Sequence, residues 1–277
     1  MKMLIKMPVK YILIILSSIA LIGCANTITK AGKKVQISST GILKKHDSTI
    51  HGYLEIPKKP GQFPTVILMH GCSGITDGVR RGLNNHVSYL VANGFAVLTL
   101  DSFRSRKKHG GVVCKSENEL GSARFYRWYD AFHALEFLQS QEEVDKDNIF
   151  LVGQSNGGSV ALMAASGVDK SRFPSEPKFR AVVAYYPWCG ALSTQIVSPL
   201  LVFGAGRDDW VPPKRCVDIK PKVRGANYNV VVYNDAHHSF DLPIPVQNYV
   251  GNTVGGNKSA TKDSQQKLLS WFQEHMR

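Results

Sequence analysis

The sequence predicts an α/β fold built on a mostly parallel β-sheet with helices on both faces. Short apolar runs of strand length alternate along the chain with stretches of helical periodicity, and this alternation is typical of parallel sheets. Strands are expected at residues 65–70, 95–101, 148–153, 180–186, 199–204 and 229–233, and helices at 82–93, 124–139, 157–167 and 264–276. No internal repeat or interior linker interrupts the series, which favours one domain.

The composition of the 277 residues is that of a globular protein, with 43% hydrophobic and 20% charged residues. The formal net charge is +13, but the lysines and arginines are scattered through residues 30–45, 104–108 and 214–224 without a nucleic-acid-binding module around them. We therefore expect no nucleic-acid partner. The excess charge is interpreted as general affinity for anionic lipid or cell-wall polymer.

The N-terminus has the pattern of an export signal. Three lysines precede an uncharged, mostly apolar run over residues 11–22, which is too short to span a bilayer but suits a secretory signal. The run ends in Leu21-Ile-Gly-Cys24 and resembles the lipobox of bacterial lipoproteins, in which the cysteine is lipidated. The alternative is an ordinary signal peptide, or an uncleaved anchor, with an incidental cysteine.

The expected organisation is a lipoprotein signal peptide at residues 1–24 with Cys24 lipidated, a tether at residues 25–48 and one α/β domain at residues 49–277. The tether is predicted because residues 25–48 are polar and rich in lysine. Removing the three lysines of the leader lowers the net charge to +10. The protein is thus expected at the bacterial cell envelope, on the periplasmic or surface side, held to a membrane by lipid alone; its oligomeric state is left open.

Four cysteines remain beyond Cys24, at positions 72, 114, 189 and 216. An even number in an oxidising compartment favours disulfides, and four cysteines allow three pairings. No Cys-x-x-Cys or His–Cys cluster is present to suggest a metal site.

Residues 153–157 read Gly-Gln-Ser-Asn-Gly, between a predicted strand and a predicted helix. Taken alone this is a glycine-rich turn that carries a serine. The spacing fits neither the dinucleotide-binding Gly-x-Gly-x-x-Gly motif nor a phosphate-binding P-loop. Strand, Gly-x-Ser-x-Gly and helix together indicate a nucleophile elbow, with Ser155 as the candidate nucleophile.

Two later loops carry the partners that a nucleophilic serine needs. Asp208 and Asp209 follow the strand expected at residues 199–204, and His237 and His238 follow the last strand. Chemistry collects in loops at the carboxyl ends of strands, and the order Ser, Asp, His is that of α/β-hydrolases. Asp208 is favoured because it lies nearer its strand, whereas Asp209 would pair locally before the proline turn. These patterns leave His237 and His238 as alternatives.

The chain resembles the dienelactone hydrolase family, a branch of the α/β-hydrolases, over roughly residues 48 to 277. The resemblance is carried by His70-Gly71, Gly-x-Ser155-x-Gly, Asp208-x-x-Val-Pro and Tyr-x-x-Ala-x-His238-x-Phe. The family's pattern selects His238, two residues before phenylalanine, and Asp208. The namesake enzymes use cysteine at the elbow, so a chain with Ser155 is more similar to the esterase-type members.

The resemblance implies a serine hydrolase that cleaves esters, thioesters or lactones of small molecules and needs no metal or cofactor. The backbone N–H groups of Asn156 and Cys72 are the expected oxyanion donors. A peptidase or acyltransferase with the same triad, and a non-catalytic surface binding module, are the alternatives. The expected fold also places consecutive cysteine-bearing loops side by side, which predicts disulfides 72–114 and 189–216.

Overall fold

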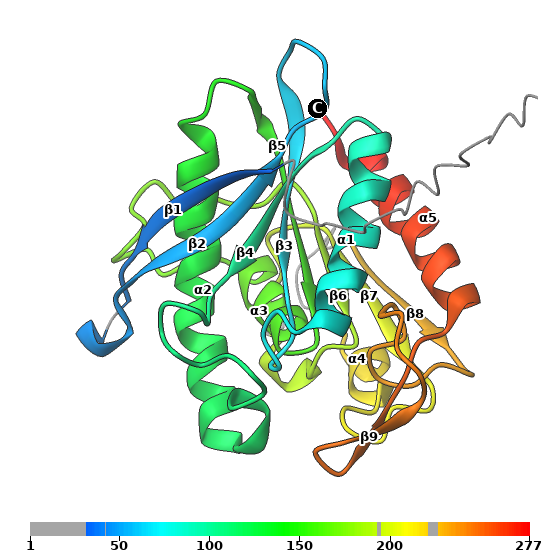
Figure 1. Cartoon of the computed structure of the whole chain (residues 1–277). Coiled ribbons are helices and arrows are strands. Elements are labelled where there is room, and N and C mark those ends of the chain that lie inside the picture. The colour runs from blue at the N-terminus through cyan, green and yellow to red at the C-terminus, as the bar shows by residue number, and fades with distance from the viewer. Residues whose placement is uncertain (1–31, 42, 193–194, 221–226) are drawn as a thin grey trace, which may run out of the picture.

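The computed structural model describes residues 32–41, 43–192, 195–220 and 227–277. Within these ranges an eight-stranded sheet forms the centre of the molecule (Figure 1). Its strands are β1 (Lys33–Ser39), β2 (Ser48–Glu55), β3 (Phe63–Met69), β4 (Ala96–Asp101), β5 (Val144–Gln154), β6 (Val182–Tyr185), β7 (Leu200–Ala205) and β8 (Tyr228–Tyr233). Their order across the sheet is β1-β2-β4-β3-β5-β6-β7-β8, and β3 to β8 are parallel. A small hairpin, β9 (Gln247–Tyr249) and β10 (Asn252–Val254), lies apart from this sheet.

Helices cover both faces of the sheet because alternate side chains of the parallel strands are apolar on each face. The helices are α1 (Asp77–Ala92), α2 (Glu117–Gln139), α3 (Asn156–Ala165), α4 (Lys214–Asp218) and α5 (Lys258–His275). In β3, Ile67 and Met69 point into the apolar core shared with α2 and α3, and Val66 and Leu68 into the core shared with α1 and α5. The two layers of helices are visible on either side of the sheet in Figure 1.

All six strands and all four helices predicted from the sequence are confirmed. Three helices begin several residues earlier than predicted, α1 at Asp77, α2 at Glu117 and α5 at Lys258. For α2 the reason is local, because the Ser116 side chain accepts a hydrogen bond from the Glu119 N–H and caps the first turn. Within the described ranges, none of the helices combines the length and the apolar composition needed to cross a membrane.

The predicted tether is wrong from residue 33 onward, because that part of it is structured. Lys33–Ser39 forms β1, which pairs antiparallel with β2 at the edge of the sheet, and Lys44–His46 forms a short 3₁₀ turn. The two lysines, Gln36 and Ser38 of β1 face solvent, while Val35, Ile37 and Ser39 are buried. This period-two alternation is typical of a half-buried edge strand. The segment is polar because one of its faces is exposed, and the prediction of an irregular tether mistook that exposed face for a disordered chain. The α/β domain therefore begins no later than residue 33.

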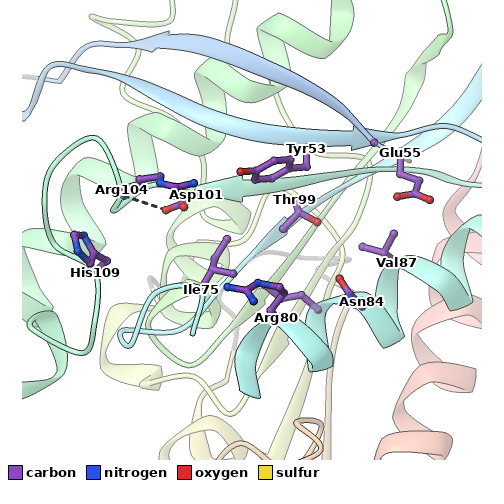
Figure 2. A pocket seen from close by; sticks show the side chains of 12 residues that line it. Tyr53, Glu55, Ile75, Arg80, Asn84, Val87, Thr99, Asp101, Arg104 and His109 are labelled. Carbon is purple, nitrogen blue, oxygen red and sulfur yellow. Dashed lines mark hydrogen bonds between the residues drawn. The ribbon is translucent and has the colours of Figure 1, made fainter. Parts of the chain in front are cut away.

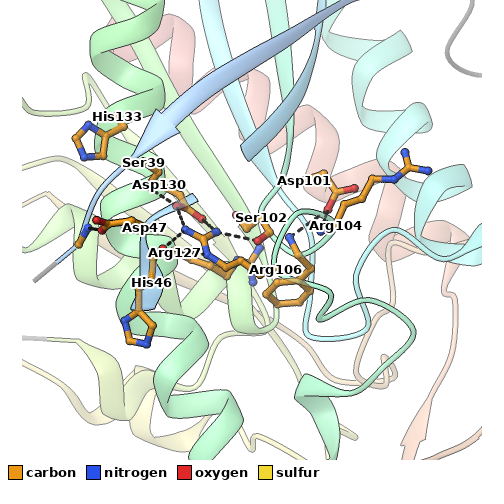
Figure 3. A network of polar contacts seen from close by, with 12 residues as sticks. Ser39, His46, Asp47, Asp101, Ser102, Arg104, Arg106, Arg127, Asp130 and His133 are labelled. Carbon is orange, nitrogen blue, oxygen red and sulfur yellow. Dashed lines mark hydrogen bonds and ion pairs between the residues drawn. The ribbon is translucent and has the colours of Figure 1, made fainter. Parts of the chain in front are cut away.

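A buried ion pair fastens this N-terminal segment to α2 (Figure 3). Arg106 donates two hydrogen bonds to the Asp130 carboxylate, at 2.8 and 2.9 Å, and a third to the His46 carbonyl at 2.9 Å. Ser39, the last residue of β1, donates its hydroxyl to the same carboxylate at 2.5 Å. The Asp130 side chain is fully buried and that of Arg106 is 9% exposed. Each charge has lost contact with water, and its attraction to the opposite charge offsets that loss.

Replacing Asp130 with alanine is expected to lower the free energy of unfolding by about 3 to 5 kcal/mol, because the Arg106 guanidinium would stay buried without its counterion. Urea denaturation followed by circular dichroism measures this. The control is Asp218→Ala, which breaks the exposed pair with Lys214 and should change stability by about 0.5 kcal/mol or less. Equal losses of stability for the two substitutions would contradict the conclusion that the Arg106–Asp130 pair stabilises the fold.

Candidate active site

Ser155 lies on the sharp turn between β5 and α3. Its φ of +53° and ψ of −115° place a non-glycine residue in a strained region of the backbone map. The turn closes only with glycine on either side of the serine. A Cβ on Gly153 would lie 2.0 Å from the Gly157 carbonyl oxygen, and a Cβ on Gly157 would lie 2.6 Å from the His70 carbonyl oxygen. The Gly-x-Ser-x-Gly spacing is therefore required by close packing of backbone against backbone.

The structure brings Ser155, His238 and Asp208 into one hydrogen-bonded chain. His238 Nε2 lies 2.9 Å from Ser155 Oγ, and His238 Nδ1 lies 2.7 Å from Asp208 Oδ2. The other carboxylate oxygen of Asp208 accepts the backbone N–H groups of Trp210 and Val211, at 3.0 and 2.9 Å. Asp208 and His238 are 4% and 2% exposed, so this network is held away from competing water.

The two neighbouring candidates make other contacts. The Asp209 carboxylate accepts the Thr253 hydroxyl at 2.7 Å and the Thr253 backbone N–H at 2.9 Å, and these hydrogen bonds lower the pKa of Asp209. His237 is outside the chain of contacts, with Nδ1 3.2 Å from the Arg207 carbonyl oxygen. Asp209 thus fastens the β9–β10 hairpin through a residue distant in sequence, so the predicted local pairing before the proline turn is wrong. His237 does not reach the serine.

Two backbone N–H groups lie beside the nucleophile. Asn156 is the first residue of α3, where an N–H has no partner inside the helix. The loop after β3 passes next to Ser155, since a Cβ on Gly71 would lie 3.3 Å from Ser155 Cβ. Cys72 follows in that loop, and its N–H donates to no backbone carbonyl of the described residues.

Two disulfides fasten the loops around the site. Cys72 bonds to Cys114 and Cys189 bonds to Cys216, with Cα–Cα distances of 5.1 and 5.3 Å. These are the pairs that the sequence predicts. The first ties the loop beside Ser155 to the loop after β4, and the second ties the loop after β6 to α4.

A cavity of about 340 Å³ opens directly onto Ser155. Its walls are mainly apolar and come from α1, the loops after β7 and β8, and the small hairpin: Val79, Trp210, Leu242, Ile244, Tyr249 and Val254. A smaller recess of about 130 Å³ also reaches the serine and is lined by Arg124, whose guanidinium stacks 4.5 Å from the Trp188 ring. Burial lowers the pKa of Arg124. The nucleophile is therefore reached from a larger apolar compartment and a smaller polar one.

A second cavity, of about 390 Å³, lies between α1 and strands β2 and β4 (Figure 2). Its lining includes Tyr53, Arg80, Thr99 and Asp101, and no member of the Ser155 network. Volume alone would select the wrong cavity. The hydrogen-bonded chain identifies the cavity of about 340 Å³ as the candidate active site.

Sequence reasoning missed a buried group that supports the histidine. The Tyr186 ring lies 4.6 Å from the His238 ring, and its hydroxyl donates to the buried carboxylate of Asp241. Asp241 also accepts from Gln154 Nε2 at 2.5 Å and from His86 Nε2 at 2.7 Å. Burial and the nearby Asp241 charge raise the pKa of Tyr186 well above its ordinary value, so its hydroxyl remains a donor. Gln154 stands at a variable position of the Gly-x-Ser-x-Gly motif, and the other three residues are dispersed in the sequence, so no short motif marked the group.

Within the described part of the chain, no group of three or more His, Cys, Asp or Glu residues is arranged to hold a metal ion. The predicted signal peptide and its Cys24 lie outside the described residues.

A mostly parallel sheet with helices on both faces, a serine on a strand-to-helix elbow, and an aspartate and histidine in later loops together define the α/β-hydrolase fold. Comparison with protein families gives the particular branch. The model of the dienelactone hydrolase family matches residues 50–276, and the chain belongs to that family. It is a hydrolase of the esterase or lactonase type.

The similarity to individual proteins is distant. A Bradyrhizobium protein named as a probable 2-oxo-3-(5-oxofuran-2-ylidene)propanoate lactonase is 22% identical over 228 residues, covering 73% of this chain and 86% of that protein. YtaP of Bacillus subtilis, whose name describes a hydrolase, is 25% identical over 141 residues, covering 46% of this chain and 47% of YtaP. The match thus spans about half the length of YtaP.

Solved structures share the fold. The dienelactone hydrolase of Anabaena variabilis superimposes with a TM-score of 0.63 at 18% identity, covering 89% of this chain and 99% of that one. The dienelactone hydrolase-like promiscuous phosphotriesterase P91, from metagenomic libraries, gives a TM-score of 0.66 at 19% identity, covering 89% of this chain and all of that one.

Proposed function

We propose that the protein is a serine hydrolase that cleaves carboxylic esters, thioesters or lactones through an acyl-enzyme. The observation that carries this proposal is the continuous hydrogen-bonded chain from Ser155 Oγ through His238 to Asp208 at the floor of an apolar cavity. A serine hydroxyl is a weak nucleophile at neutral pH, and an adjacent histidine oriented by a carboxylate is the arrangement that activates it.

In the proposed mechanism, Ser155 Oγ attacks the acyl carbonyl carbon while His238 Nε2 takes the hydroxyl proton. The carbonyl oxygen becomes an oxyanion, which accepts hydrogen bonds from the backbone N–H groups of Asn156 and Cys72. Collapse of the intermediate expels the alcohol or thiol, which receives the proton from His238. Water then attacks the acyl-enzyme by the same steps, and the carboxylic acid leaves. Asp208 stabilises the imidazolium that forms each time.

The lining of the active-site cavity supports an apolar acyl or ring portion in the substrate. Side chains such as Leu242, Ile244 and Val254 offer no hydrogen bonds to a polar substrate group. The names of the Bradyrhizobium lactonase and the phosphotriesterase P91 are in keeping with cyclic or activated esters. Hydrolysis of compact, apolar esters is the activity that this site fits best.

We also propose export and lipid attachment at Cys24, because a basic leader, an apolar run and a terminal cysteine occur together at the N-terminus. This would hold the hydrolase at the cell envelope without a membrane-spanning helix. Mass spectrometry of the mature N-terminus, from cells grown with a labelled fatty acid, tests the proposal. A mature chain that begins elsewhere and carries no lipid would contradict it.

Incubating the folded protein with a fluorophosphonate probe tests the proposed enzymatic function. One molecule of probe is expected to bind per chain, because the probe reacts only with an activated serine. A panel of p-nitrophenyl esters should then show a maximum of kcat/KM at short to medium acyl chains and a decline once the chain exceeds the cavity. Absence of both labelling and hydrolysis would favour a non-catalytic binding module, and cleavage of peptide amides but not esters would favour a peptidase.

The two disulfides should differ in their effect on catalysis. Replacing Cys72 and Cys114 with serine is expected to lower the free energy of unfolding by about 4 kcal/mol, from the sequence separation of 42 residues. It should also lower kcat about tenfold or more, because the loop that carries the Cys72 N–H loses its fixed position. The matched change at Cys189 and Cys216, with a separation of 27 residues, should cost about 3.5 kcal/mol with a smaller change in kcat. Ester hydrolysis and urea denaturation of both variants measure this, and equal kcat values would contradict it.

A further inference from the structure

Arg127 on α2 is a fully buried cation that touches both sides of the candidate oxyanion hole. Its side chain is 0% exposed. Nη1 donates to the side-chain oxygen of Asn156 at 2.8 Å, and Nη2 donates to the backbone carbonyl of His70 at 2.6 Å. Asn156 directly follows the nucleophile, and His70 precedes Gly71 and Cys72. One planar guanidinium therefore joins the two segments that carry the candidate oxyanion donors.

The charge of Arg127 is not neutralised by an ion pair. No carboxylate oxygen lies within 4 Å of it among the described residues, because the nearby Asp130 pairs with Arg106, as Figure 3 shows. Its Nε lacks a hydrogen-bond acceptor in the same part of the chain, and the guanidinium packs 4.8 Å from the Phe103 ring. An uncompensated buried cation is costly to a fold, and an apolar side chain of similar volume would fill the space without that cost.

The Arg127 charge also acts on the neighbouring His70 ring. Burial first, and the Arg127 charge second, lower the pKa of His70 to about 3. The ring therefore stays neutral, with Nδ1 2.7 Å from the Gly71 carbonyl oxygen. A potential that disfavours a proton on one side of the loop favours an anion on the other, and the oxyanion of acyl transfer forms beside this loop.

We propose that Arg127 is a positioning residue for the oxyanion hole. It holds the Asn156 and Cys72 N–H groups at a fixed separation and adds a positive charge behind them. Pre-arranged dipoles and charges of this kind act on the transition state and little on the bound ground state. The inference rests on the proposed serine hydrolase function and assigns the donors of that site a common support.

The test replaces Arg127 with methionine and, separately, with lysine, and measures ester hydrolysis per active site titrated with a fluorophosphonate. Arg127→Met is expected to lower kcat about 30-fold or more, since loss of one oxyanion donor alone costs on the order of a hundredfold, and to leave KM within about threefold. Arg127→Lys keeps the charge but cannot bridge the Asn156 side-chain oxygen and the His70 carbonyl oxygen in one plane. Its kcat should therefore lie between that of the unaltered protein and that of Arg127→Met. A trifluoromethyl ketone inhibitor, whose serine adduct carries a tetrahedral oxyanion, should lose affinity by the same factor by which kcat/KM falls.

Two further variants separate this role from a structural one. Arg106→Lys changes an equally central arginine whose partner is Asp130, so it should affect stability and leave kcat and the inhibitor constant within about twofold. Asn156→Asp keeps an acceptor for Arg127 but cancels its charge, and should lower kcat and inhibitor affinity in a folded protein. If Arg127→Met does not fold, Arg127→Lys and Asn156→Asp decide the question.

The proposal is overturned if the Arg127 variants and Asn156→Asp keep the wild-type kcat per titrated site, or if kcat falls while inhibitor affinity is unchanged. These results differ from failure of the proposed function itself, in which the unaltered protein would neither react with the fluorophosphonate nor hydrolyse esters.

Discussion

Replacing Ser155 with alanine is expected to lower kcat for a p-nitrophenyl ester by about 10⁴-fold or more and to abolish fluorophosphonate labelling. The reason is chemical: without the hydroxyl no acyl-enzyme forms, and only binding and the oxyanion donors remain to assist water. The substitution removes one oxygen atom from a strained turn, so folding should be preserved. Steady-state hydrolysis and gel fluorescence after labelling measure the two effects.

Ser198→Ala is the matched control, because Ser198 is a buried serine outside the site whose hydroxyl finds no partner among the described residues. It should label and hydrolyse like the unaltered protein. Labelling that persists in Ser155→Ala would show that a different residue is the nucleophile and would overturn the mechanism.

The second large effect is expected for Asp208→Asn, with kcat lowered by about 10⁴-fold, the size found when a triad aspartate becomes asparagine. The substitution is nearly isosteric, but an amide nitrogen can face His238 Nδ1 and favour the wrong tautomer of the ring. KM should change little, because Asp208 contacts the histidine and two backbone N–H groups. Steady-state kinetics of the purified variant measure both constants.

Asp209→Asn is the adjacent control, since the Asp209 carboxylate contacts Thr253 on the hairpin. It should leave kcat within about threefold and affect mainly KM, through the hairpin that lines the cavity. A larger loss in Asp209→Asn than in Asp208→Asn would reverse the assignment made from the structure.

The parallel part of the fold was predictable because its strands are buried on both faces. Such strands are nearly continuous apolar runs, as in β3 and β7, and they are distinct from the helical periodicity between them. The edge strand β1 was not predicted, since it buries only alternate residues and its exposed lysines make the segment polar on average. The short β9–β10 hairpin and α4 also escaped prediction, because a few residues carry too little periodicity to be distinguished from loops.

Some residues of the candidate site were also predictable from the sequence, and others were not. Ser155, Asp208 and His238 were found from their order and their loops, because the parallel topology brings those loops to one edge. Choosing between the two histidines needed the family resemblance, and the structure now shows the contact of His238 with Ser155. Arg127 and Tyr186 could not be found from sequence patterns, since their hydrogen-bond partners come from distant segments of the chain.

The position of β1 has a consequence for how the hydrolase would face a membrane. Lys33 pairs with Leu54, and Leu54 pairs with Leu98 near the beginning of β4. The chain therefore enters the sheet at the end where the parallel strands begin. Ser155 follows the end of β5, at the opposite edge. If Cys24 carries lipid, the eight residues between it and β1 reach at most about 28 Å. Such a short connection would orient the opening of the active-site cavity away from the bilayer, toward molecules dissolved in the surrounding compartment.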